Sequence, residues 1–237
     1  SQLDMDRMDY LKRDSFYSGV QEGIIGSDRI IHMLNVVEDQ LVVESKGIYS
    51  IEKFLIARRL MYWQVYLHKT VLSAENMLIK ILKRAKELSQ SGEELFGSSA
   101  LKLFLKNNFT LNDFRKNEEV FQSFTILDDQ DVLAAIKEWQ FHEDKILATL
   151  SNKIVQRKLL KIEVTDEVVS EARLLEMKNL VANYYNIDIT QTDYLAFKDS
   201  ISNYAYTSHK SNINILYKDG SLKDIADASD QLNISAL

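Results

Sequence analysis

The sequence of 237 residues contains no cysteine, no proline and only seven glycines. The absence of cysteine excludes disulfide bonds and thiolate chemistry, and it fits a reducing, cytoplasmic location. The absence of proline removes the usual helix breaker, although average usage would give roughly a dozen prolines in a chain of this length. We therefore predict a mostly α fold with unusually long helices.

Long apolar runs and an excess of positive charge are also lacking. No run approaches the ~20 apolar residues that span a bilayer, so we predict no membrane segment. The chain has 29 Lys and Arg against 35 Asp and Glu, which makes nucleic acid an unlikely partner. An acidic total still permits a basic pocket for one phosphorylated ligand, because a site depends on a few local charges.

Helical spacing of apolar residues predicts most of the elements. Asp4 is placed to cap a first helix, which the glycines from Gly19 onward end. From residue 50 to about residue 90 there is neither Gly nor Pro, which predicts one helix of about 40 residues or two packed helices. Further helices are predicted over residues 28–34, 95–109, 129–155 and 166–185.

Alternating patterns predict a smaller β part. Residues 36–43 indicate a β-hairpin, and residues 157–164 a strand. Alternation over 201–206 and 212–217, followed by the turn Lys218-Asp219-Gly220, indicates a small sheet that closes the chain. We assign residues 1–160 to a helical domain and residues 161–237 to a small α+β region.

The first predicted helix carries a polar stripe. Asp6, Tyr10 and Asp14 follow at steps of four and share one face, with Arg7 and Arg13 beside it. A solvated face with i,i+4 pairs explains this pattern, and spacing alone favours that interpretation. The alternative is a ligand-facing stripe, in which one carboxylate holds a metal, the phenol donates a hydrogen bond and the second carboxylate accepts from a sugar hydroxyl.

The predicted long helix carries a second stripe. Arg58, Tyr62, Tyr66 and Lys69 follow at four, four and three residues, again on one face. Two cations and two phenols suit an anionic ligand that also has a ring or a sugar. Equally, tyrosines on a long helix can pack in a core, while Arg and Lys stems shield apolar surface.

Histidine chemistry is poorly represented. None of the four histidines is followed by Asp, and no pair has the spacing of a zinc site. We interpret His142-Glu143-Asp144 as a surface cluster in the middle of a helix. Serine nucleophile elbows, phosphate-binding loops and dinucleotide fingerprints are absent.

The segment QLDMDRMDYLKRD at residues 2–14, followed by Tyr17 and Gly19-Val20, resembles the last motif of the HD-domain phosphohydrolases of the deoxynucleoside triphosphate triphosphohydrolase type. The resemblance continues in order through most of the chain. It includes Asp28-Arg29-Ile30, the hairpin, residues 54–58, Tyr66 with His68-Lys69, residues 128–136, Arg157-Lys158 and the closing Lys218-Asp219-Gly220. It implies the helical HD-like fold, and hydrolysis of deoxynucleoside triphosphates to deoxynucleoside and triphosphate.

The resemblance also implies roles for individual residues. Asp6 would be a ligand of a divalent metal, which Mg, Mn, Fe, Zn or Ni could supply. The implied substrate contacts are Arg7 with phosphate, Tyr10 and Asp14 with the deoxyribose, Arg58 with the triphosphate and Tyr66 against the sugar. Arg29 and Lys69 match positions at subunit contacts of nucleotide-regulated relatives, and a homo-oligomer, dimer or tetramer, is expected. Tyr62 stands where a human relative has a histidine.

The His and His-Asp motifs that begin the family's metal site have no counterpart here. We therefore identify no catalytic residue in this chain, and expect it to be inactive alone as the C-terminal portion of a longer enzyme. Two alternatives stay open. One is an HD nucleotidase acting on another phosphorylated nucleotide, and the other is a non-catalytic oligomerisation or scaffold relative.

Overall fold

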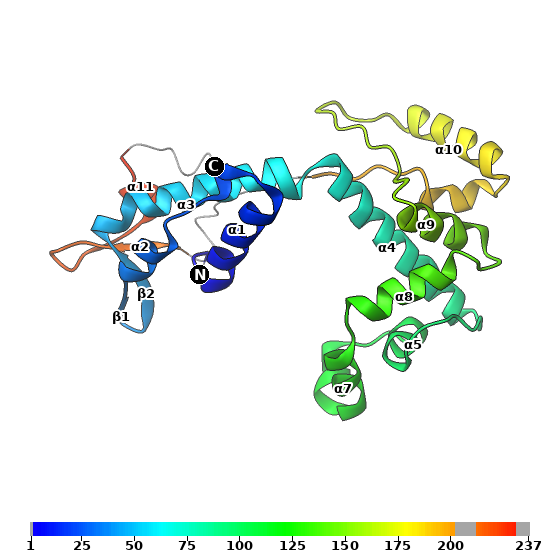
Figure 1. Cartoon of the computed structure of the whole chain (residues 1–237), viewed down its shortest axis with the longest axis horizontal. Coiled ribbons are helices and arrows are strands. Elements are labelled where there is room, and N and C mark those ends of the chain that lie inside the picture. The colour runs from blue at the N-terminus through cyan, green and yellow to red at the C-terminus, as the bar shows by residue number, and fades with distance from the viewer. Residues whose placement is uncertain (1, 202–211, 231–237) are drawn as a thin grey trace. The chain divides into compact units, whose positions relative to one another are not determined.

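The computed structural model describes residues 2–201 and 212–230. The chain forms two compact units, unit 1 from residues 1–68 with 200–237 and unit 2 from residues 69–199. Figure 1 colours unit 1 blue to cyan and orange to red, and unit 2 teal to yellow. The sequence-based boundary at residue 160 differs from this division, because a strand near the end of the chain pairs with one near its beginning.

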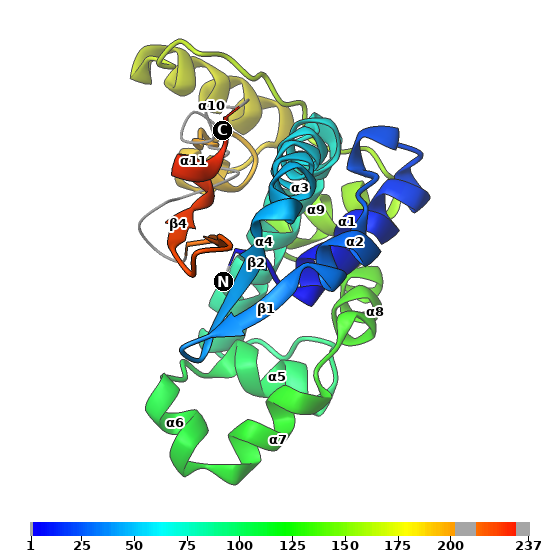
Figure 2. The ribbon, with the colours of Figure 1, turned by 90° about the vertical axis from the view of Figure 1, so that its left-hand side faces the viewer.

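Unit 1 combines helices with one four-stranded sheet. Its elements are α1 (Met5–Ser18), α2 (Ser27–His32), β1 (Leu34–Val37), β2 (Gln40–Glu44), α3 (Ile48–Met61), β3 (Asn214–Leu216), β4 (Leu222–Asp224) and α11 (Ile225–Ala228). The sheet order is β1-β2-β3-β4, in which only β2 and β3 run parallel. Figure 2, turned by 90° from Figure 1, shows the β1–β2 hairpin and β4.

The start of the chain folds as its local signals predict. The Asp4 side chain accepts a hydrogen bond from the Arg7 backbone N–H at 2.8 Å, and α1 ends at Gly19 with φ 74°. Both are standard helix caps, since Gly adopts the left-handed conformation without steric cost. The predicted hairpin is also confirmed, with Glu38 and Asp39 at φ 49° and 61° in its turn.

The core of unit 1 fixes α1 against α3. Leu11 of α1 and Phe54 and Met61 of α3 are fully buried. A Cβ on Gly23 would lie 2.7 Å from Met61 Sδ and 2.8 Å from Ser15 Cβ, so this position has room only for glycine. This close approach sets the geometry of the two helices that carry the predicted site residues.

Unit 2 is helical. Its elements are α4 (Lys69–Gln90), α5 (Ser99–Lys106), α6 (Leu111–Lys116), α7 (Glu118–Ile126), α8 (Asp129–Trp139), α9 (Lys145–Val155) and α10 (Glu171–Tyr185). Its core lies between α4, α5, α8 and α9, where Ile81, Trp139 and Leu147 are buried. The Trp139 indole N–H donates to the Phe96 carbonyl oxygen at 2.9 Å, which satisfies its one polar atom.

The mostly α fold with a small β part is confirmed, but several boundaries differ. The pattern over 50–90 is two helices, α3 and α4, separated by a π-helical turn at Tyr62–Tyr66 and by Leu67-His68. No strand forms at 157–164, and most of the alternating segment 201–206 lies outside the described residues. The helix predicted over 95–109 is shorter at both ends, and the helix predicted over 166–185 begins later but ends at Tyr185 as predicted.

The single helix predicted over 129–155 is also wrong. It divides into α8 and α9, because Asp144 caps α9 by accepting from the Leu147 N–H at 2.8 Å. His142 therefore lies in a turn rather than within a helix.

Candidate functional site

Helix α1 carries the first polar stripe at successive turns. Asp6 is exposed, whereas Tyr10 and Asp14 are half-buried on the side that faces α3. Arg13 contacts the carboxylate of Asp9 at 2.9 Å and that of Asp14 at 3.7 Å. The stripe thus has a solvated edge with i,i+4 pairs and an inner part that meets a second helix.

The end of α3 supplies the second stripe. Arg58 lies in its last turn, and Tyr62 and Tyr66 begin and end the π-helical turn. The Leu67 N–H donates to the Tyr62 carbonyl oxygen at 2.7 Å, five residues back, which is the bond that defines a π-turn. Lys69 begins α4 in unit 2, so the prediction that it shares one helix face with Arg58 is wrong.

The two stripes meet within unit 1. The Tyr66 hydroxyl donates to Asp14 Oδ2 at 2.8 Å, across 52 residues of sequence. The Tyr66 ring makes edge contacts with Tyr10 at 6.0 Å and with Tyr62 at 5.1 Å between centroids. The Arg58 guanidinium carbon lies 5.8 Å from the centroid of the Tyr62 ring. We call these residues the site cluster: Tyr10, Asp14, Arg58, Tyr62 and Tyr66.

The environment of Tyr10 and Tyr66 favours the protonated form of both phenols. Burial, followed by the hydrogen bond to Asp14, raises the pKa of Tyr66 well above its usual value. Burial also raises the pKa of Tyr10, although the positive charge of Arg58 opposes this. The site cluster therefore combines phenol hydroxyls with one guanidinium and one carboxylate group, a set suited to phosphate and hydroxyl groups.

The described residues do not complete a metal centre. Within residues 2–201 and 212–230, no three His, Cys, Asp or Glu side chains gather closely enough to hold a metal ion. Asp6 is exposed and would offer a single carboxylate. The resemblance implied a further His and His-Asp, so the described residues do not by themselves fit a divalent metal.

Arg7 and Arg29 have partners outside the site cluster, although the charge of Arg7 also lowers the pKa of Tyr10. Arg7 is half-buried and forms an ion pair with Asp4, the residue that caps α1. Arg29 is exposed on α2 and its Nη2 lies 3.4 Å from the Lys46 carbonyl oxygen. Their implied roles stay predictions.

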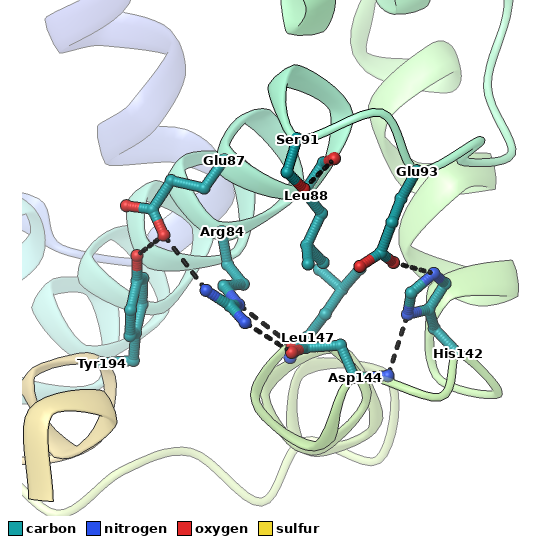
Figure 3. Close-up of polar contacts among 9 residues, drawn as sticks. All are labelled: Arg84, Glu87, Leu88, Ser91, Glu93, His142, Asp144, Leu147 and Tyr194. Carbon is teal, nitrogen blue, oxygen red and sulfur yellow. Dashed lines mark hydrogen bonds and ion pairs between the residues drawn. The ribbon is translucent and has the colours of Figure 1, made fainter. Parts of the chain in front are cut away.

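Unit 2 has a polar network of similar composition (Figure 3). Arg84 of α4 binds Asp144 with two hydrogen bonds, at 3.1 and 2.6 Å, and contacts Glu87 at 3.3 Å. The Tyr194 hydroxyl donates to the same Glu87 carboxylate. We call Arg84, Glu87, Asp144 and Tyr194 the Arg84 network. Because each charge meets an opposite charge, we interpret it as structural.

His142 extends this network. Its Nδ1 accepts from the Asp144 backbone N–H at 3.0 Å, and its Nε2 lies 3.5 Å from a Glu93 carboxylate oxygen. Figure 3 shows the ring between these two partners. Since Nδ1 accepts, the neutral ring carries its proton on Nε2 and donates toward Glu93. This arrangement orders the turn before α9.

Sequence reasoning placed Tyr62 in the second stripe, four residues from both Arg58 and Tyr66, but gave it no role of its own. That double spacing was the available signal. The T-shaped contact with Tyr66 could not be read from it, because the intervening backbone is a π-turn.

Known proteins match part or nearly all of this chain. Residues 25–98 match the model of the HD associated region, which begins after α1 and includes α3 and the π-turn. The uncharacterized protein YwfO of Bacillus subtilis is 31% identical over 95% of this chain and 51% of its own length. The uncharacterized protein MG461 of Mycoplasma genitalium is 27% identical over 97% of this chain and 54% of its own length. The chain thus spans about half the length of these curated relatives.

Two further similarities concern proteins whose names state an activity. A phosphohydrolase of Bacteroides thetaiotaomicron has a crystal structure that matches 100% of this chain and 59% of that chain, with a TM-score of 0.89 and 51% identity. A deoxynucleoside triphosphate triphosphohydrolase SAMHD1 homolog of Dictyostelium discoideum is 30% identical over 39% of this chain and 18% of its own length. No helix among the described residues combines the length and apolarity needed to cross a membrane. Residues 25–98 are thus similar to an HD associated region, and the chain as a whole is similar to part of a protein named a phosphohydrolase.

Proposed function

We propose that this chain is the substrate-binding part of a phosphohydrolase that cleaves deoxynucleoside triphosphates to deoxynucleoside and inorganic triphosphate. The observation that carries the proposal is the site cluster itself. It brings a guanidinium for an anionic phosphate within reach of phenols and a carboxylate suited to a sugar. The similarity to a named phosphohydrolase supports the reaction class.

The site cluster also suggests how a deoxyribose would be preferred. In this proposal Tyr66 packs against the sugar at C2′ while its hydroxyl is held by Asp14. A ring held in this way leaves no space for a 2′-hydroxyl, so a ribonucleotide binds less well. Asp14 has a second carboxylate oxygen that can accept from the 3′-hydroxyl of the sugar.

The experiment is release of inorganic triphosphate from deoxynucleoside triphosphates, with Mn²⁺ or Mg²⁺ present and all four nucleotides supplied as possible effectors. We expect activity in the full gene product, loss of activity in its Asp6→Ala variant, and no activity in the 237-residue chain alone. Each deoxynucleotide is compared with its ribonucleotide. Equal rates on the two sugars would reject the deoxyribose assignment, and the absence of any triphosphate release would reject the reaction.

The assembly is part of the same proposal. We expect a homo-oligomer, with Arg29 and Lys69 at or near contacts between copies. Light scattering of the full gene product tests this, and a monomer at all concentrations would contradict it.

A further inference from the structure

Tyr62 contacts both groups that would hold the substrate in the proposed function. On one side its ring lies under the Arg58 guanidinium, 5.8 Å from centroid to guanidinium carbon. On the other side its ring meets the edge of Tyr66 at 5.1 Å, with an angle of 77° between the planes. Both contacts are made by the aromatic ring rather than by the hydroxyl.

The backbone holds Tyr62 in this place. The π-turn is closed by the 2.7 Å bond from the Leu67 N–H to the Tyr62 carbonyl oxygen, so the residues at both ends of this bond are tied together. Met61, immediately before Tyr62, is fully buried against Gly23. A residue with a fixed backbone, a guanidinium on one side and a ring on the other has few rotamers available.

Arg58 needs such support because an arginine side chain has many rotamers. Tyr10 and Tyr62 both interact with Arg58, Tyr10 by charge and hydrogen bonding and Tyr62 through its ring face. An arginine already oriented loses less conformational freedom when it binds an anion. The same ring limits the movement of Tyr66, whose hydroxyl is fixed separately by Asp14.

We propose that Tyr62 is a positioning residue, whose ring orients Arg58 toward an anionic phosphate group and holds Tyr66 against the sugar. This rests on the proposed function for the identity of the substrate. The ring performs this role, so a phenylalanine replaces it and an aliphatic residue does not. In this role the Tyr62 hydroxyl takes no part in proton transfer.

The kinetic experiment uses the full gene product. We expect Tyr62→Leu to raise KM for a deoxynucleoside triphosphate about tenfold while kcat changes less than about threefold, because binding is lost rather than chemistry. Tyr62→Phe should stay within about twofold of wild type in both constants. Trp63→Phe, at the exposed neighbour on the same π-turn, is the matched control and should leave both constants unchanged. Near-ultraviolet circular dichroism checks that each variant is folded.

A double-mutant cycle tests the link to Arg58. In an Arg58→Met background, Tyr62→Leu should raise KM by clearly less than tenfold, since one of the two groups that Tyr62 holds is gone. Equal effects of Tyr62→Leu in both backgrounds would overturn the proposal. So would a Tyr62→Phe variant as impaired as Tyr62→Leu, which would assign the role to the hydroxyl.

A binding measurement separates this proposal from the proposed function. Inorganic triphosphate is titrated into wild type, Tyr62→Phe and Tyr62→Leu by calorimetry, without any turnover. Weaker binding by about tenfold in Tyr62→Leu alone supports the positioning role even if no nucleotide is hydrolysed. Equal binding in all three, or no binding by wild type, overturns the positioning role whatever the enzymatic activity.

Discussion

Each unit of this chain contains a cluster built from arginine, carboxylate and tyrosine side chains, and the two clusters differ in how their charges are paired. In the Arg84 network the guanidinium binds Asp144 with two hydrogen bonds, and the side chains of both residues are less than one-fifth exposed. In the site cluster, Arg58 is placed beside phenol rings while Asp14 binds Tyr66. The Arg84 network thus pairs a guanidinium with carboxylates, whereas the site cluster places a guanidinium and a carboxylate beside phenols.

The largest difference should appear when each arginine is removed. Arg84→Met leaves Asp144 poorly solvated without its partner, so we expect the free energy of unfolding of unit 2 to fall by about 3 kcal/mol. We expect a smaller loss in unit 1 from Arg58→Met, because the contacts of Arg58 with Tyr10 and Tyr62 are with phenols and their loss leaves no buried carboxylate behind.

The two tryptophans allow each unit to be followed separately in urea. Trp63 lies in unit 1 and Trp139 in unit 2, so Trp63→Phe leaves a reporter of unit 2 and Trp139→Phe a reporter of unit 1. Equal losses from the two arginine substitutions would show that the two clusters do not differ in the way described.

Acid should affect the Arg84 network next. Burial raises the pKa of Asp144, but the hydrogen bonds from Arg84 and from the Leu147 N–H outweigh it and hold this pKa below its usual value. The stabilisation is therefore complete above about pH 4 and is lost as the pH falls through the lowered pKa. Urea titrations of unit 2 between pH 6 and pH 2 measure this loss. Unit 2 of the Asp144→Asn variant should be less stable than wild type at pH 6, and its free energy of unfolding should depend less on pH. The same pH dependence in variant and wild type would contradict the role given to Asp144.

The smallest difference concerns the phenol hydroxyls. Tyr194→Phe removes the hydroxyl donor to Glu87 and Tyr66→Phe the donor to Asp14, and each should cost its unit about 1 kcal/mol because both carboxylates are partly exposed. Burial and the hydrogen bond to Glu87 raise the pKa of Tyr194 to about 12. Its contribution is therefore full below pH 10 and declines as the pH rises toward 12. A Tyr194→Phe variant with the same alkaline profile as wild type would refute this.

The local signals predicted most helices and the hairpin well, because caps and apolar spacing act within a few residues. Asp4 and Gly19 bound α1 as expected. The end of α3 was not predicted, because Tyr62–Tyr66 contains neither Gly nor Pro and the π-turn depends on packing. The division before α9 did have a signal, the capping residue Asp144, which helical periodicity on both sides concealed.

The site was predicted in part for a similar reason. Steps of four residues correctly placed Tyr10 and Asp14 on one face of α1, and the resemblance selected Arg58 and Tyr66. The hydrogen bond between Asp14 and Tyr66 joins two helices 52 residues apart, and single-sequence spacing carries no information about such a pair. The ring contacts of Tyr62 depend on the same approach of α3 to α1.

The parallel pairing of β2 with β3 has a consequence for the order in which the chain folds. Val42 pairs with Asn214, so the sheet of unit 1 closes a loop that contains all of unit 2. Closing a loop of about 170 residues costs about 2 kcal/mol more in chain entropy than closing one a tenth as long. Unit 2 is continuous in sequence and can collapse while the chain is still being synthesised, which shortens that loop. The third and fourth strands, made after unit 2, then complete a sheet whose first two strands were made before it.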